Sequence, residues 1–116
     1  MVRAGDQVAI ACKPGVVSPP LDVRADQRFL PFLISLTCTL SRVPGTVTIT
    51  DWFRDPAANR AAGGADNSLH VAGLAVDLRH DEAGMVAYAL WLDAGLDAVD
   101  EGDHYHLEWD GPGTIA

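Results

Sequence analysis

The chain has 116 residues, of which 48% are apolar and 21% are charged, a composition typical of one globular domain. No run of about eighteen apolar residues occurs, so the sequence predicts no membrane span. The formal net charge of −8 argues against binding to nucleic acid or to an anionic surface, since both select basic patches. We therefore expect a single domain over residues 1–116, whose ligand is neither nucleic acid nor an anionic surface. We also expect the protein to be a monomer.

The N-terminal residues contain no basic segment followed by an apolar one, so the sequence predicts no secretory signal peptide. We expect a protein made in the cytoplasm. Residues 8–12 are a short apolar stretch that predicts a strand or an extended arm. Cys12 and Cys38 do not have the spacing of a metal site, and Cys38 lies in an apolar helical pattern. We expect it to be a buried free thiol.

A first long helix is expected over about residues 26–42, where apolar residues recur at helical spacing and Asp26 can cap the start. Residues 46–52 alternate β-branched side chains and predict a strand. A loop rich in Ala, Asn and Gly follows. Its Gly63-Gly64 pair would allow the backbone to approach a ligand closely.

A second strand is expected over residues 74–79, where aliphatic residues alternate with other types and Asp77 takes the opposite face. Residues 81–95 predict a helix that ends at a glycine, and a short segment follows at 96–99. Residues 104–109 alternate again, so their even-numbered side chains share one face of a last strand. This order predicts an α+β fold, with a small, mostly antiparallel sheet and helices packed on one of its faces.

Two histidines and one aspartate have the side-chain chemistry of a catalytic zinc site. His70 and Asp77 lie seven positions apart, and His106 follows about thirty residues later. Two imidazoles and one carboxylate leave the fourth position of a tetrahedral zinc ion open for water. Zinc lowers the pKa of that water and polarises a carbonyl oxygen. We therefore predict that His70, Asp77 and His106 bind zinc.

A hydrolytic zinc site also needs a general base within hydrogen-bond distance of the water. Asp103, three residues before the last predicted ligand, is the first candidate. A regular strand would direct it to the wrong face, so the turn at Gly102 has to redirect it. Glu101 and Glu108 are the alternatives. His104 shares a face with the last ligand and could donate a hydrogen bond to an oxyanion or orient the base.

Two further polar residues flank the predicted ligands. Arg54 directly follows the strand at 46–52 and stays charged. It could hold the developing charge of a carbonyl or a substrate carboxylate, and a surface ion pair with Asp55 is the alternative. Ser68 could bind substrate or serve only the turn in which it lies.

The predicted ligands lie in a specific motif. Ser68, His70, Gly73, Ala75 and Asp77 match every fixed position of S-x-H-x-x-G-x-A-x-D. In this respect the sequence resembles the zinc peptidases typified by D-Ala-D-Ala carboxypeptidases, vancomycin-resistance dipeptidases and phage L-alanyl-D-glutamate endolysins. The resemblance extends over about residues 46–109.

Outside this motif the resemblance rests on single residues. Asp103 matches the acidic base that precedes the family's second zinc histidine by three residues. His104 matches a second histidine found in some members. Arg54 matches the family's arginine at a strand end, and Asn59 follows it. The resemblance thus implies catalytic roles for Asp103, Arg54 and His104, and substrate contacts for Ser68, Arg54 and Asn59.

The resemblance implies a hedgehog-type α+β fold and cleavage of peptidoglycan stem peptides at bonds involving D-amino acids. In that family the acidic base activates zinc-bound water and then protonates the leaving amine, while the arginine supports the carbonyl oxygen. The compact chain resembles phage endolysins that cut the L-alanyl-D-glutamate bond, and no separate wall-binding domain is expected. A D-Ala-D-Ala carboxypeptidase or dipeptidase, and a non-catalytic zinc-binding module of the same fold, are the alternatives.

Overall fold

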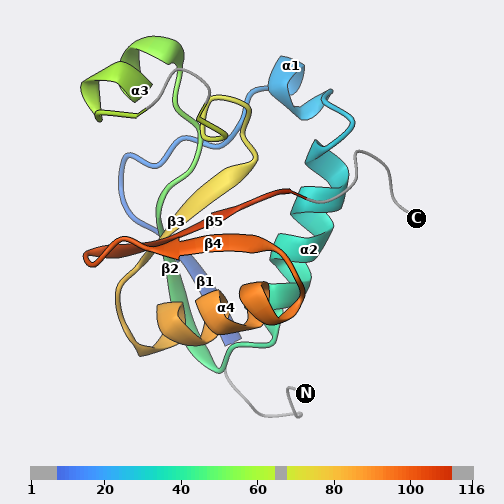
Figure 1. The fold of residues 1–116 in the computed structure, drawn as a ribbon, viewed down its shortest axis with the longest axis vertical. Helices are drawn as coiled ribbons and strands as arrows, with labels where there is room; N and C mark the ends of the chain where they lie inside the picture. Colours follow the sequence, from blue (N-terminus) through green and yellow to red (C-terminus); the bar gives the residue numbers. More distant parts are fainter. Residues whose placement is uncertain (1–7, 65–67, 111–116) are drawn as a thin grey trace.

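The computed structural model describes residues 8–64 and 68–110, which form a five-stranded sheet with helices around it (Figure 1). The strands are β1 (Val8–Cys12), β2 (Gly45–Asp51), β3 (Ala75–Arg79), β4 (Asp97–Asp100) and β5 (His104–Glu108). They lie in the order β1-β2-β3-β5-β4. The predicted α+β class is confirmed.

The sheet is mixed, and the prediction of a mostly antiparallel sheet is corrected in this respect. β1 and β2 are parallel, whereas the pairs β2–β3, β3–β5 and β4–β5 are antiparallel. Two parallel neighbours need a long crossover connection, and here the chain passes through two helices between β1 and β2. The stretch at 8–12, predicted as a strand or an arm, is therefore a strand of the sheet.

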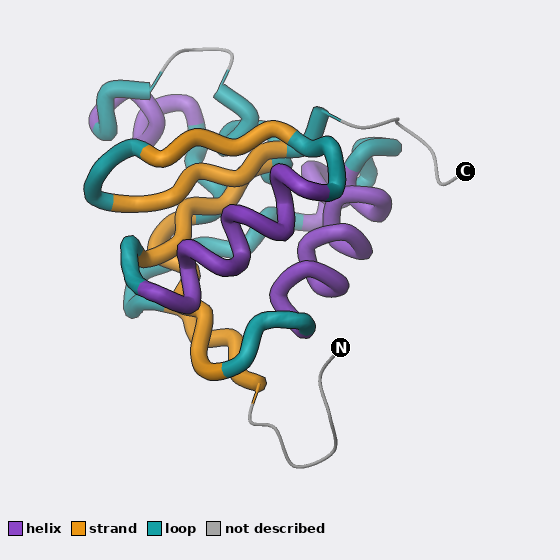
Figure 2. The backbone as a smooth tube through the Cα atoms, turned by 60° about the horizontal axis from the view of Figure 1, so that its bottom comes forward, coloured by secondary structure: helices purple, strands orange, loops and turns teal. Residues whose placement is uncertain are grey.

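The helices are α1 (Leu21–Arg24), α2 (Phe29–Ser41), α3 (Pro56–Ala61) and α4 (Glu82–Asp93). The long helices α2 and α4 lie side by side and cover one face of the sheet, as predicted (Figure 2). The short helices α1 and α3 were not predicted, and both lie at one end of the sheet (Figure 1). In the described part of the chain, no helix combines the length and the hydropathy needed to cross a bilayer.

The start of α2 differs from the prediction. Asp26 does not cap the helix, because its carboxylate accepts hydrogen bonds from the backbone N–H of Arg28 (2.8 Å) and from the Arg28 guanidinium (3.0 and 2.8 Å). These bonds hold the pKa of Asp26 at about 2. The helix begins at Phe29, directly after this turn.

The outer face of α2 explains a second error. Cys38 is exposed, and so is Cys12; both are free thiols. Leu30 and Ile34, which lie two turns and one turn of the helix before Cys38, are 54% and 44% exposed. These three residues lie on one face, since positions four apart are neighbours on a helix. The helix is apolar on both faces, so sequence pattern alone assigned Cys38 to the wrong one.

The core lies between the sheet and the two long helices. Phe32 of α2 meets Trp91 of α4 edge to face, with ring centroids 6.0 Å apart. The Trp91 indole N–H donates to the carbonyls of Asp97 (2.9 Å) and Glu108 (3.1 Å), which joins α4 to both β4 and β5. This packing fixes the positions of the strands that carry the candidate site.

The alternation of side chains leaves the other face of β3 and β5 polar. Val76 and Leu78 of β3 are fully buried in the core, as is Leu107 of β5. Their neighbours in sequence therefore point away from α2 and α4. Asp77 and His106 are directly paired across β3 and β5.

Candidate metal centre

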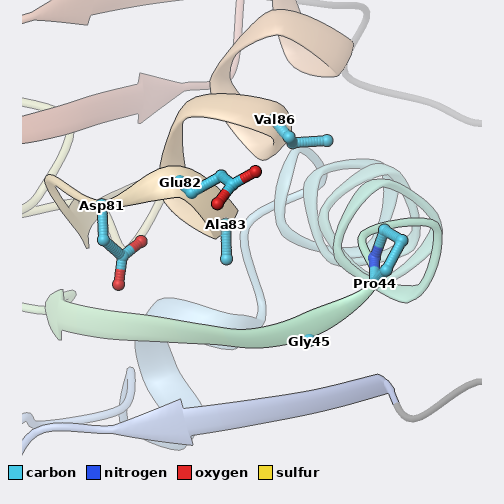
Figure 3. Close-up of a pocket in the computed structure, with 6 residues that line it drawn as sticks. All are labelled: Pro44, Gly45, Asp81, Glu82, Ala83 and Val86. Carbon is cyan, nitrogen blue, oxygen red and sulfur yellow. The ribbon is translucent and has the colours of Figure 1, made fainter.

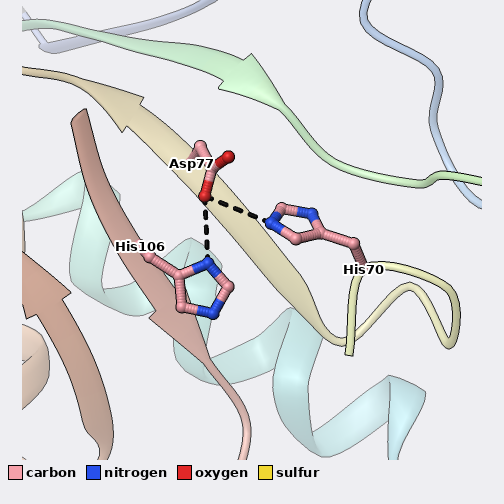
Figure 4. A group of neighbouring side chains, drawn as sticks. All are labelled: His70, Asp77 and His106. Carbon is pink, nitrogen blue, oxygen red and sulfur yellow. Dashed lines mark hydrogen bonds and ion pairs between the residues drawn. The ribbon is translucent and has the colours of Figure 1, made fainter. Parts of the chain in front are cut away.

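The three predicted zinc ligands converge on this polar face (Figure 4). One carboxylate oxygen of Asp77 lies 3.2 Å from Nε2 of His70 and 3.0 Å from Nδ1 of His106. The three potential ligand atoms all lie within 4.8 Å of one another. His70 and Asp77 are only 2% and 4% exposed. The structure thus brings the three side chains close enough for a single metal ion to contact all of them.

Each ligand is positioned by a different piece of backbone. Asp77 and His106 are paired on adjacent strands, so the register of β3 and β5 brings them together. His70 lies in the turn before β3, and the hydroxyl of Ser68 accepts a hydrogen bond from the His70 N–H (3.3 Å). The segment after β2 holds this turn in place. There, the Arg54 N–H donates to the His70 carbonyl (3.2 Å).

The motif glycine closes this turn. Gly73 has φ of +72°, a conformation that disfavours any side chain. A Cβ at this position would also lie 2.8 Å from Pro19 Cγ and 2.9 Å from Val23 Cγ1. The Trp52 indole N–H donates to the Gly73 carbonyl (3.0 Å). Backbone conformation and packing therefore both require glycine here.

The hydrogen-bond partners of the two imidazoles allow additional positive charge, from a proton or a metal ion, among these side chains. Nδ1 of His70 lies 2.6 Å from the Trp52 carbonyl, which can only accept, so Nδ1 carries the proton and Nε2 faces Asp77. His106 has a carboxylate oxygen at both nitrogens, from Asp77 at Nδ1 and from Glu108 at Nε2 (2.8 Å). A neutral imidazole donates at one nitrogen only.

Either extra protons or a metal ion must therefore lie among these side chains. Two imidazole nitrogens and a carboxylate oxygen are the donors that a hydrolytic zinc site uses. The Trp52 carbonyl and the Glu108 carboxylate are partners of the kind that zinc-bound imidazoles have. The residues present thus fit zinc.

The acid–base properties of the group agree with this fit. Burial alone would raise the pKa of Asp77, but hydrogen bonds from His106 and His70 outweigh it and hold that pKa well below its usual value. Burial alone would lower the pKa of His106, but Asp77 and Glu108 raise it above its usual value. Both effects favour a negative carboxylate beside positive charge. A metal ion would replace the protons of the imidazoles.

The centre opens into a cavity of about 330 Å³. Its walls come from the loop after β2, the turn before β3, and the β4–β5 turn. The lining residues are Arg54, Ala62, Gly63, Gly64, Ser68, His70, Asp77, Glu101, His104 and His106. Four of the predicted non-ligand residues, Arg54, Ser68, Glu101 and His104, therefore lie at the cavity.

Arg54 is held by acidic side chains. Its guanidinium lies 2.6 Å from Asp51 and 3.4 Å from the second carboxylate oxygen of Asp77, and its side chain is 17% exposed. Asp55, considered as its surface partner, instead accepts from the Ala58 N–H (2.7 Å) and caps α3. The sequence offered no signal for Asp51, whereas Asp55 followed by proline is a recognisable helix start.

Asn59 lies behind Arg54. It is 1% exposed, and its amide oxygen accepts from the Arg54 guanidinium (3.4 Å). A Cβ at Gly64 would collide with this amide, so glycine at that position leaves space for Asn59. The structure thus places Asn59 against Arg54 rather than at the cavity wall, and its substrate contact stays a prediction.

The candidate bases occupy three different positions. The Asp103 side chain is 88% exposed, and its carboxylate lies 2.6 Å from Nδ1 of His104. Nε2 of His104 in turn lies 3.7 Å from Asp77. Glu101 lines the cavity, and Glu108 contacts His106. Among the described residues, His104 links Asp103 to the centre, and the identity of the base stays a prediction.

Another hollow, of about 380 Å³, lies between the start of β2 and the first turns of α4 (Figure 3). Its lining residues are Pro44, Gly45, Asp81, Glu82, Ala83 and Val86. The Asp81 carboxylate already caps α4 by accepting from the Gly84 N–H (2.8 Å). The described residues that line this hollow include no imidazole and no cationic side chain, whereas the cavity of about 330 Å³ has both. That cavity is therefore the candidate site.

Two imidazoles and one carboxylate converge on the open face of this small mixed sheet. This set of donors is typical of the metal centre of a hydrolase. Residues 10–95 match the model of the family Peptidase M15, and the chain belongs to this family of zinc-dependent peptidoglycan peptidases. The match includes Arg54, His70 and Asp77 but ends before β5. His106 is therefore assigned to the site from its position in the structure, not from the family match. Comparisons with curated proteins and with solved structures found no match.

Proposed function

We propose that this protein is an active zinc endopeptidase that cuts the L-alanyl-D-glutamate bond of peptidoglycan stem peptides. The observation that carries the proposal is the convergence of His70, Asp77 and His106 at a cavity that also contains Arg54. The resemblance to the phage endolysins of this family supports this choice of bond. The cell wall as the place of action belongs to the same proposal.

His70 through Nε2, Asp77 through its carboxylate and His106 through Nδ1 would hold the zinc ion. When bound, zinc supplies a water molecule of lowered pKa and polarises the carbonyl to be cleaved. Asp77 leaves the centre with a net positive charge. Such a charge suits a stem peptide, because these peptides carry carboxylates.

Arg54 provides a fixed positive charge beside the centre. Asp51 and Asn59 hold its guanidinium from behind, so little conformational freedom is lost when substrate binds. A charge that is already in place can stabilise the negative charge that develops on the carbonyl oxygen. We assign Arg54 this role.

Proton transfer is assigned to Asp103, which would take a proton from the water and return it to the leaving amine. Its spacing to His106 and its contact with His104 support the assignment. The side chain lies at a turn where Gly102 has φ of +90°, and a rotation there would be needed to direct it into the cavity. Glu101, which already lines the cavity, is the competing base.

The test uses purified cell walls, with mass spectrometry of the released fragments to identify the bond that is cut. Wild-type protein with zinc should release fragments with new N-terminal D-glutamate, and a chelator should stop the release. Fragments that lack only the terminal D-alanine would instead indicate a carboxypeptidase. Absence of any cleavage by zinc-loaded protein would indicate a non-catalytic module.

Two variants separate the roles of the site residues. Asp103→Asn should bind zinc like wild type and lose most activity, whereas full activity would move the base to Glu101. His70→Ala should abolish stoichiometric zinc binding, measured by elemental analysis. His80→Ala is the matched control, because His80 pairs with Asp100 outside the site (3.0 Å) and its loss should leave bound zinc unchanged.

A further inference from the structure

Glu108 occupies a specific place beside His106. The two residues are two apart on β5 and share its open face, and a Glu108 carboxylate oxygen lies 2.8 Å from Nε2 of His106. The other ring nitrogen of His106 faces Asp77 at 3.0 Å. The imidazole is thus held between two carboxylates, one on the side of the centre and one on the side away from it.

We propose that Glu108 is a positioning residue, which fixes the ring orientation and the tautomer of His106 so that Nδ1 is available to the metal. The Glu108 carboxylate can only accept, so it selects the form in which Nε2 carries the proton. The lone pair of Nδ1 then points to the Asp77 side. The proposal rests on the metal site of the proposed function and assigns Glu108 a task other than general base.

The backbone of Glu108 is well suited to hold its side chain steady. Glu108 is paired with Ala75 of β3, and its carbonyl accepts from the buried Trp91 indole (3.1 Å). The next residue, Trp109, donates its N–H to the Leu74 carbonyl (2.9 Å). A carboxylate fixed to a core-anchored strand loses little conformational freedom when it orients a neighbouring ring.

The geometry argues against Glu108 as the base. The imidazole of His106 lies between Glu108 and Asp77, so a group bound at Nδ1 is screened from Glu108 by the ring itself. Glu108 is also not among the residues that line the cavity, whereas Glu101 is. A general base has to reach the water that it deprotonates.

The imidazole of His70 is oriented in the same way. Nδ1 of His70 donates to the Trp52 carbonyl (2.6 Å), which leaves Nε2 for the centre. Both histidines therefore have one nitrogen paired with an acceptor and the other directed to Asp77. Of the two orienting acceptors, only the Glu108 carboxylate can be removed by substitution.

The experiment compares Glu108→Ala, Glu108→Gln and the control Glu82→Gln, which removes one negative charge on α4. Zinc affinity is measured by competition with a chromogenic chelator. Loss of a partner behind a metal-binding histidine typically weakens metal binding by about 10- to 100-fold, and we expect this for Glu108→Ala. Glu108→Gln keeps an acceptor and should recover a large part of the affinity. Glu82→Gln should match wild type.

A second readout reports the tautomer directly. Long-range ¹⁵N–¹H correlation spectra of the zinc-loaded protein should show the His106 proton on Nε2 in wild type and in Glu108→Gln. In Glu108→Ala the exchange of that proton with water should accelerate. Thermal unfolding of the metal-free variants checks that each one folds.

Three other outcomes would overturn the positioning role of Glu108. Zinc affinity of Glu108→Ala within twofold of wild type would overturn the positioning role while leaving the metal site intact. Full zinc binding by Glu108→Gln with complete loss of wall cleavage would make Glu108 a base. Absence of zinc binding by the wild-type protein would instead overturn the proposed function, and the role of Glu108 with it.

Discussion

Substitution of Gly73 by alanine tests the packing that holds His70 in place. Gly73 has φ of +72°, and the added methyl group would meet the ring of Pro19 at 2.8 Å and the side chain of Val23 at 2.9 Å. Pro19 is fully buried and its ring is stiff, so it cannot turn away. The turn or the segment before α1 must therefore shift.

The expected loss has two parts. A left-handed backbone costs a non-glycine residue about 1 to 2 kcal/mol. Forcing a methyl group into a packed region costs about 1 to 3 kcal/mol. The sum is about 2 to 5 kcal/mol, and at about 4 °C per kcal/mol for a chain of this size it should lower Tm by about 8 to 20 °C.

Thermal unfolding followed by circular dichroism, with a chelator present, measures this loss without a contribution from bound metal. The control is Gly95→Ala after α4, where φ is +83° and no atom of the described residues lies within 4 Å of the added methyl group. The control should lose only the backbone part, about 1 to 2 kcal/mol. Equal losses in the two variants would refute the argument that Pro19 and Val23 press on the turn.

Two further predictions concern the core and the start of α2. Trp91→Phe leaves the carbonyls of Asp97 and Glu108 without their donor and should lower the free energy of unfolding by about 2 to 4 kcal/mol in urea titrations; an unchanged midpoint would contradict the role of the indole N–H. Asp26→Asn should cost less than about 1 kcal/mol near neutral pH, because the ion pair with Arg28 is partly exposed. The pKa of Asp26 is lowered from 3.8 to about 2, so its stabilisation is fully present well above pH 3.8 and is lost as the pH falls through 2; a difference between variant and wild type that persists undiminished well below pH 2 would contradict this.

Much of the site could be predicted because strand periodicity assigns faces without knowledge of strand pairing. Alternation in β3 and β5 put Asp77 and His106 opposite to the aliphatic residues, and the structure places both on the open face. The motif turn brought His70 to the same place. For these residues local pattern and tertiary structure agree.

Other features depend on contacts that no local pattern encodes. The parallel pairing of β1 joins segments separated by two helices, and the exposure of Cys38 depends on which face of α2 meets the sheet. The Asp51–Arg54 contact arises from the chain path at the end of β2 and was not anticipated. In contrast, the contact of Glu108 with His106 had a signal, since residues two apart on a strand share a face.

The acceptors that orient the two histidines differ in how easily an amino-acid substitution removes them. A main-chain oxygen at position 52 is presented by any amino acid, so replacement of Trp52 would disturb His70 only through the side chain's own contacts, such as the bond to Gly73. The acceptor for His106 is lost with a single missense change. Among diverged descendants of this chain, we therefore expect position 108 to vary less freely than position 52.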